Sequence, residues 1–132
     1  MRPNNWPAML DAIVAEYTAR ELEWGVNDCG LFCAEWVRRV GGPDFGPYFG
    51  TYTDQKTAAA YVKKIGYKNM REVVDKHLDK VPVLKAQRGD IVFYTPWSCA
   101  VVLGCTSISP GESATNSGLL TRPVFEARTA YK

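Results

Sequence analysis

The chain is 132 residues long, which is enough for one domain with a buried core. Hydrophobic residues make up 46% of the sequence and charged residues 23%, close to the average of folded soluble proteins, which excludes a disordered tail, a collagen-like fibre and a coiled coil. The 16 basic and 14 acidic residues give a formal net charge of +2, which is too balanced for a protein that neutralises nucleic-acid phosphates.

The sequence predicts neither a membrane segment nor a secretion signal. No uninterrupted apolar stretch reaches the roughly 18 residues that a membrane-spanning helix needs. Near the N-terminus, Asp11 and Glu16 break the apolar run that a signal peptide requires. We therefore expect a protein that is made in the cytoplasm, does not insert into membranes and keeps its four cysteines as free thiols.

Three helices are predicted from capping residues and apolar spacing. The first is expected to end near residues 21–23, and the other two follow the capping residues Asp54 and Asn69. Residues 43–53 are rich in Gly, Pro and aromatic residues, which predicts an ordered loop packed by its own rings. The predicted apolar stripes of the three helices cover residues 6–17, 58–65 and 70–78.

A fourth helix, with one fully apolar face, is predicted over 29–40. Asn27 and Asp28 precede it, and a carboxylate at this position accepts hydrogen bonds from the free N–H groups of the first turn. The Gly-Gly-Pro sequence at 41–43 ends the helix. We expect the apolar face to pack against the predicted sheet that contains residues 91–105. That face consists of Cys29, Phe32, Cys33, Trp36, Val37 and Val40.

The apolar pattern changes to that of strands after residue 88. Short runs of β-branched and aromatic residues predict strands over 91–95, 99–105, 119–122 and 124–131. The Ser-, Thr- and Gly-rich segment 106–118 predicts a loop with at most one short strand. Helices come first and a small antiparallel sheet second, so we expect an α+β fold in a single domain spanning 1–132.

The residue that points most directly to chemistry is Cys29, at the predicted start of a helix. The helix dipole and the unpaired N–H groups of a first turn favour the thiolate form of a cysteine. A thiolate placed there can attack a carbonyl carbon while the neighbouring N–H groups hold the oxyanion that forms. The alternative interpretation is a small, buried residue in a well-packed helix start.

Three short segments resemble the NlpC-type branch of the papain-like cysteine hydrolases. They are WGVNDCGLF at 24–32, AQRGDIV at 86–92 and VVLG at 101–104. The chain is most similar to short NlpC-like proteins that phages and prophages encode near tail genes, in which a Gly-Leu-x-x-x-Pro segment such as GLLTRP at 118–123 also recurs. The resemblance spans about residues 6–131 and implies a papain-like fold, with N-terminal helices packed on an antiparallel sheet.

The resemblance assigns functional positions one by one. The nucleophile maps onto Cys29, the base histidine onto Ser98, and the third polar member of the triad onto Asn116. A serine cannot take up the thiol proton at neutral pH, and a tyrosine that such enzymes often carry falls on Leu22. His77, the sequence's one histidine, lies outside the order of the triad. It is interpreted as a surface or half-buried helical residue, with a relocated base for Cys29 as the alternative.

The spacing of the four cysteines limits a metal site. Ser98 is predicted to be the strand residue nearest the Cys29 sulfur, in which case Cys99 faces away, because strand side chains alternate. Cys99 and Cys105 are predicted at opposite ends of one strand, roughly 20 Å apart, which is too far for one zinc ion. A site made of Cys29, Cys33 and one strand cysteine is the metal alternative. We expect buried free thiols, with no metal and no cofactor.

Two functions from different classes follow. The first is a virion protein, structural or assembly-related and associated with the phage tail, with a degenerate NlpC-like fold. Its partners would be other phage tail proteins, with a homo-oligomer in the assembly, and its contacts would use Trp97, the loop 43–53 with Tyr48 and Phe49, or the loop 106–118. The alternative is an active cysteine peptidase or amidase that acts on bacterial cell-wall peptides, with Cys29 as nucleophile.

Overall fold

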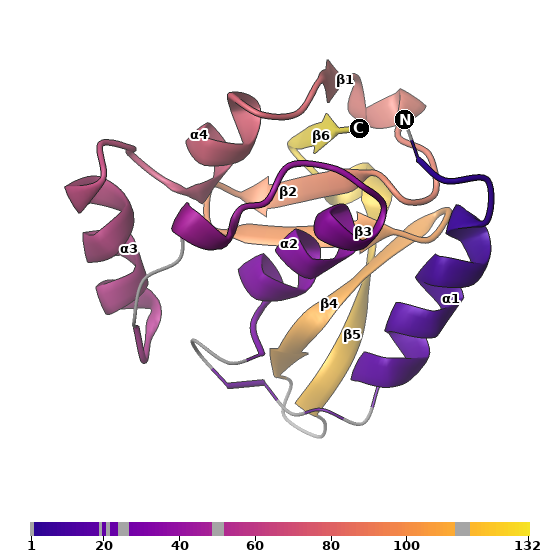
Figure 1. The fold of residues 1–132 in the computed structure, drawn as a ribbon, viewed down its shortest axis with the longest axis horizontal. Coiled ribbons are helices and arrows are strands. Elements are labelled where there is room, and N and C mark those ends of the chain that lie inside the picture. Colours follow the sequence, from indigo (N-terminus) through magenta and orange to yellow (C-terminus); the bar gives the residue numbers. More distant parts are fainter. Residues whose placement is uncertain (1, 19, 21, 24–26, 49–51, 113–116) are drawn as a thin grey trace.

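The computed structural model describes the chain apart from residues 1, 19, 21, 24–26, 49–51 and 113–116 (Figure 1). No helix in the described part is both long enough and apolar enough to cross a membrane. The α-helices of this part are α1 (Trp6–Tyr17), α2 (Cys29–Arg39), α3 (Gln55–Lys64) and α4 (Met70–Asp75). Short 3-10 turns also form: η1 (Gly46–Tyr48), η2 (Val83–Lys85) and η3 (Val124–Glu126).

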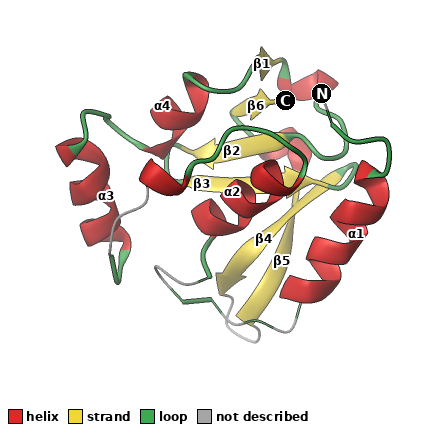
Figure 2. Ribbon diagram, viewed as in Figure 1, coloured by secondary structure: helices red, strands yellow, loops and turns green. Residues whose placement is uncertain are grey.

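The strands of the described residues form one six-stranded antiparallel sheet. They are β1 (Lys80–Val81), β2 (Ile91–Thr95), β3 (Ser98–Val102), β4 (Thr106–Glu112), β5 (Ser117–Pro123) and β6 (Thr129–Tyr131). Their order in the sheet is β1-β6-β2-β3-β4-β5, so that β6, the last strand in the chain, pairs with both β1 and β2. The predicted α+β class, with helices first and an antiparallel sheet second, is confirmed (Figure 2).

Helix α2 lies against β3 and β4, α1 contacts β5, and α3 stands to one side of the sheet (Figure 1). The main core fills the space between α1, α2 and this face. A smaller cluster on the other face contains Val92, Ala100 and Val102. There η2 and η3 contact each other, and they carry the most exposed large apolar side chains of the described residues, Leu84 and Phe125.

The predicted packing of α2 against the sheet is confirmed. Phe32 and Trp36 are at most 1% exposed, and Val40 after the helix end is also buried. The indole Nε1 of Trp36 donates to the carbonyl oxygen of Gly89 at 2.9 Å, which joins the helix to the turn before β2. The position of Cys29, at the start of this helix, is therefore fixed by a well-packed element.

Several predicted boundaries are wrong. The first helix ends at Tyr17, where its apolar stripe ends, and the Thr18 hydroxyl donates to the Val14 carbonyl at 2.6 Å. The segment 106–118, predicted as a loop with at most one short strand, begins with the seven-residue strand β4 and ends with the first residues of β5. Its residues are polar, but Ser107 is fully buried and its hydroxyl lies 2.5 Å from that of Tyr94. The predicted strand 124–131 contains the turn η3 followed by the shorter strand β6.

The aromatic loop before α3 is held by its own rings, as predicted, over its described residues. The ring of Phe45 lies 6.2 Å from that of Tyr48, and Tyr48 meets Tyr67 edge-on at 5.7 Å between centroids. Aromatic pairs in such geometry contribute about 0.5–1.5 kcal/mol each beyond burial. This loop and the helices α3 and α4 form one side of the site described next.

Candidate functional site

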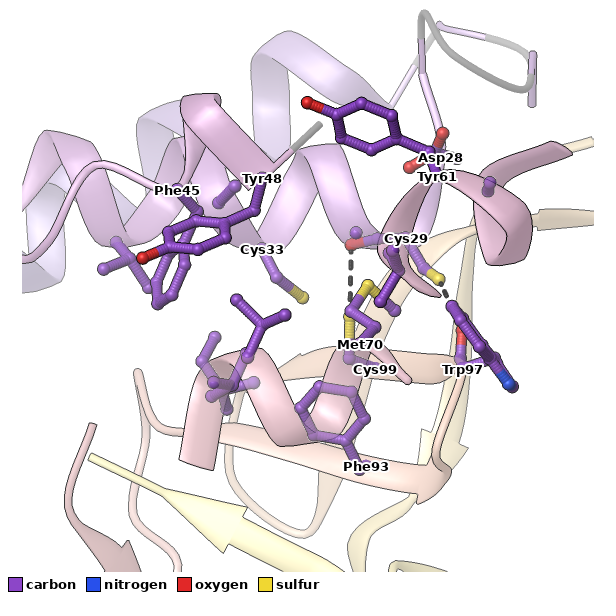
Figure 3. A pocket seen from close by; sticks show the side chains of 18 of the residues that line it. Asp28, Cys29, Cys33, Phe45, Tyr48, Tyr61, Met70, Phe93, Trp97 and Cys99 are labelled. Atoms are coloured by element: carbon purple, nitrogen blue, oxygen red, sulfur yellow. Dashed lines mark hydrogen bonds between the residues drawn. The ribbon is translucent and has the colours of Figure 1, made fainter. Parts of the chain in front are cut away.

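Cys29 is the first residue of α2, as the sequence predicted. The preceding Asp28 has extended backbone and accepts a hydrogen bond from the Leu31 N–H at 2.9 Å, so it caps the helix. The Cys29 thiol donates to the carbonyl oxygen of Trp97, with sulfur and oxygen 3.6 Å apart (Figure 3). A carbonyl oxygen only accepts hydrogen bonds, so this weak contact favours the protonated thiol of Cys29 over the thiolate.

Cys99, on β3, is the strand cysteine that reaches the start of α2. Its thiol donates to the carbonyl oxygen of Cys29 at 3.4 Å, and its side chain contacts those of both Cys29 and Cys33. The prediction that Ser98 lies nearest to Cys29 and that Cys99 faces away is therefore wrong. Ser98 is two residues before Ala100 on β3, so their side chains share one face of the sheet, opposite to the face of Cys99.

The physical reason is the register of β3. Cys99 and Val101 belong to the core cluster beneath α2, which fixes the alternation of the whole strand. The pairing with β2 is irregular between Phe93 and Thr95, next to the turn that leads into β3. Cys99, and not Ser98, therefore faces the start of α2, whereas the assignment of Ser98 to the histidine position stays a prediction from the resemblance.

The surroundings of Cys29 raise its pKa. The largest cause is the side-chain contact with Cys99, followed by burial, and the nearby Asp28 carboxylate acts in the same direction. A hydrogen bond with the Cys99 backbone lowers the pKa of Cys29, but the other causes outweigh it. The pKa of Cys33 is raised as well, and burial is the largest cause. For Cys99, the contact with Cys29 lowers the pKa, but the contact with Cys33 and burial outweigh it, so its pKa is raised. The three thiols therefore share an environment that disfavours thiolate.

Asp28 is nearly fully buried and holds a second group besides the helix end. Its Oδ2 accepts a hydrogen bond from the Tyr52 hydroxyl at 2.5 Å. Burial and this bond raise the pKa of Tyr52, so the tyrosine stays protonated. Sequence analysis did not single out Tyr52, because nothing in an aromatic loop distinguishes the one ring that reaches back to a helix cap.

His77 is not a partner of Cys29. Its Nδ1 donates to the carbonyl oxygen of Val73 at 2.8 Å, which leaves Nε2 to accept from the Tyr48 hydroxyl at 2.8 Å. The ring also meets that of Phe45 edge-on, with centroids 5.5 Å apart. His77 is half-buried, as predicted, but it lies in the turn after α4, which ends at Asp75, and not in the helix. Its two ring nitrogens are engaged by Val73 and Tyr48, so neither is directed at Cys29.

A cavity opens beside Cys29, between α2, α3, α4 and the strands β2 and β3. Figure 3 shows Cys33, Cys99 and Met70 gathered around it, with Phe93 below and Trp97 at one side. Trp97 is half-buried: part of its side chain packs against the main core and part stays accessible, so its role as an interface anchor stays a prediction. Tyr48, another predicted contact residue, also lines this cavity and is half-buried.

The remaining predicted site residues have the following outcomes. Asn116 and Phe49 lie outside the described residues. Cys105 is an exposed free thiol in the turn after β3, away from the other three cysteines. Within the described part of the chain, no group of three or more His, Cys, Asp or Glu side chains is arranged to hold a metal ion, so the three-cysteine alternative has no support.

A family model described as "Domain of unknown function (DUF6950)" matches residues 1–132, and the chain therefore belongs to that family. No curated protein and no solved structure matches the chain.

Proposed function

We propose that this member of the DUF6950 family is a non-hydrolytic protein with a papain-like, NlpC-type fold that works as a structural or assembly component of a phage particle, in the tail. The assignment to a phage particle and its tail rests on the resemblance of the sequence segments around Cys29 and the Gly-Asp turn. The non-hydrolytic character comes from the geometry around Cys29. The protein would be made in the host cytoplasm and would then join the virion, beside other tail proteins or copies of itself.

The observation that carries the non-hydrolytic part of the proposal is the hydrogen bond from the Cys29 thiol to the Trp97 carbonyl. A cysteine nucleophile needs a base within hydrogen-bond reach to take its proton. Here the proton is directed at a carbonyl oxygen, which is not a base. The thiol of Cys99, rather than an imidazole, stands opposite on the strand. Within the described residues, the imidazole of His77 is bonded to other groups.

The electrostatics support the same conclusion. A helix N-terminus lowers the pKa of a thiol, and an exposed cysteine in that position would be reactive. The contact with Cys99, burial and the Asp28 carboxylate act against this effect, and the pKa of Cys29 is well above its usual value. An ordinary thiol is only a few per cent thiolate at pH 7, so Cys29 has even less of the reactive form.

The thiol chemistry can be tested within one protein, because Cys105 is an exposed internal reference. The protein is treated with iodoacetamide at pH 6, and the labelled cysteines are identified by mass spectrometry over time. We expect Cys105 to react first and Cys29 to react slowly, together with Cys33 and Cys99. Faster labelling of Cys29 than of Cys105 would show an activated nucleophile and favour the cell-wall hydrolase instead.

The assembly role is tested by two substitutions. Cys29→Ala should leave particle yield and infectivity intact, because the thiol does no chemistry. Trp97→Ala should reduce assembly, since an anchoring tryptophan at an interface contributes about 2 kcal/mol or more. Both variants are first checked for folding by circular dichroism. Normal particles that lose infectivity in Cys29→Ala, with no effect of Trp97→Ala, would contradict the proposal.

A further inference from the structure

The cavity beside Cys29 is lined mainly by apolar side chains. Aliphatic and aromatic side chains from α2, α3, α4 and β2 form most of its surface, among them Val37, Val62, Val74 and Phe93. Sulfur-bearing side chains, seen in Figure 3, line another part of it, and Asp28, Gln55 and tyrosine hydroxyls supply its polar groups. Such walls favour apolar groups, because a polar group that enters loses its hydrogen bonds to water.

Three polar groups in the cavity wall are paired inside the protein, while the exposed Gln55 at the start of α3 also lines the cavity. The hydroxyl of Tyr52 donates to Asp28, and that of Tyr48 donates to the ring of His77. The thiol of Cys29 donates to the Trp97 carbonyl. A ligand in this space therefore finds little to hydrogen-bond with, which argues against a peptide, a sugar or an anion as the bound group.

The size of the cavity limits the ligand further. The space open to the centres of water-sized groups is about 70 Å³. Since about 10–15 Å³ of such space holds one water molecule, the cavity has room for roughly six non-hydrogen atoms. Helix α3 covers one side and buries only Val62 among its residues, so entry on that side requires the displacement of little buried surface.

We propose that this cavity is a binding site for a short, uncharged alkyl chain. The inference extends the proposed function, in that the space beside Cys29 holds a ligand without reacting with it. It concerns the walls of the cavity and not the thiol, so the two proposals can fail separately. If iodoacetamide labels Cys29 slowly and the cavity binds no alkyl ligand, only the proposed non-hydrolytic function is supported. If iodoacetamide labels Cys29 fast and the cavity does bind an alkyl ligand, only the proposed binding site is supported.

The test uses 1-alkanols as probes, from ethanol to 1-octanol, titrated into ¹⁵N-labelled protein. We expect saturable shifts of the backbone amide signals of Cys29, Val62 and Val74 in NMR spectra. Binding should strengthen with chain length up to roughly 1-hexanol and then level off, because the space is filled. Shifts that do not saturate, or that centre on the exposed Leu84 and Phe125, would overturn the proposal.

A matched pair of variants on α3 separates filling of the cavity from general effects. Ala58 lines the cavity, whereas Ala60 is exposed on the same helix. Ala58→Leu should weaken 1-hexanol binding about tenfold, because the added carbons occupy the free space, and Ala60→Leu should not change it. If Ala58→Leu does not fold, Ala34→Val on α2 fills the cavity from the opposite side. Unchanged binding in a folded filling variant would refute the location of the site.

Discussion

Replacement of Asp28 by Ala tests whether this buried residue stabilises the fold through two separate hydrogen bonds, one to the start of α2 and one to Tyr52. The substitution removes the hydrogen bond to Leu31 N–H, and the loss of an N-cap costs about 0.5–2 kcal/mol. It also leaves the Tyr52 hydroxyl without its carboxylate in a buried position, which costs a further 1–3 kcal/mol or so. We therefore expect Asp28→Ala to lower the free energy of unfolding by about 2–4 kcal/mol, measured by urea denaturation followed by circular dichroism.

The control for this prediction is Asp54→Ala. Asp54 caps α3 in the same way, through the Thr57 N–H at 2.8 Å, but on the protein surface and without a tyrosine partner. Its loss should cost only about 1 kcal/mol. In the double variant Asp28→Ala/Tyr52→Phe the hydroxyl is gone, so part of the cost should be recovered. If the two alanine variants are destabilised equally, the bond between Asp28 and Tyr52 contributes nothing and the reasoning is refuted.

Three further variants test the packing around the site. Trp36→Phe, which removes the bond to the Gly89 carbonyl, should cost about 1–2 kcal/mol in urea denaturation. Gly89→Ala should be destabilising by ~1 kcal/mol or more, because φ is +89° and the new Cβ would lie 3.0 Å from another side chain, whereas Gly104→Ala, in open space, should be tolerated. Burial and Asp75 raise the pKa of Tyr131 to about 12. The folded protein thus holds this proton more tightly than the unfolded chain, and stability should fall between pH 10 and 12, less steeply in Tyr131→Phe. Equal slopes in the two proteins, or wild-type stability in Trp36→Phe or Gly89→Ala, would contradict these expectations.

The helix starts were predictable because their signals are local. Asp28, Asp54 and Asn69 each cap a helix that begins at the next residue, and a capping side chain acts within three residues of its own position. The strand β4 was not predictable in the same way. Its Ser and Thr residues resemble a loop, and it is a strand because β3 and β5 pair with it on both sides.

Within the site, the sequence predicted which cysteine begins the helix but not which residue meets it. The identity of Cys29 as the first residue of α2 depends on the local cap alone. The contact with Cys99 depends on the face that β3 turns to the helix, which the packing of Cys99 and Val101 into the main core decides. The bond from Tyr52 to Asp28 joins residues 24 positions apart, so no local pattern could reveal it.

The position of β6 between β1 and β2 has a consequence for how the protein is synthesised. The ribosome makes β1 and β2 early, but β1 is joined to the rest of the sheet through β6, whose register pairs Tyr131 with both Lys80 and Ile91. Until residue 131 has left the exit tunnel, the growing chain can form β2–β5 but carries β1 as a loose segment and one uncovered edge on β2. A nascent chain in this state presents β2, an apolar strand with free backbone groups, to other chains. Residues 129–131 thus close this part of the sheet, and chains that lack them should aggregate more readily than chains that carry them.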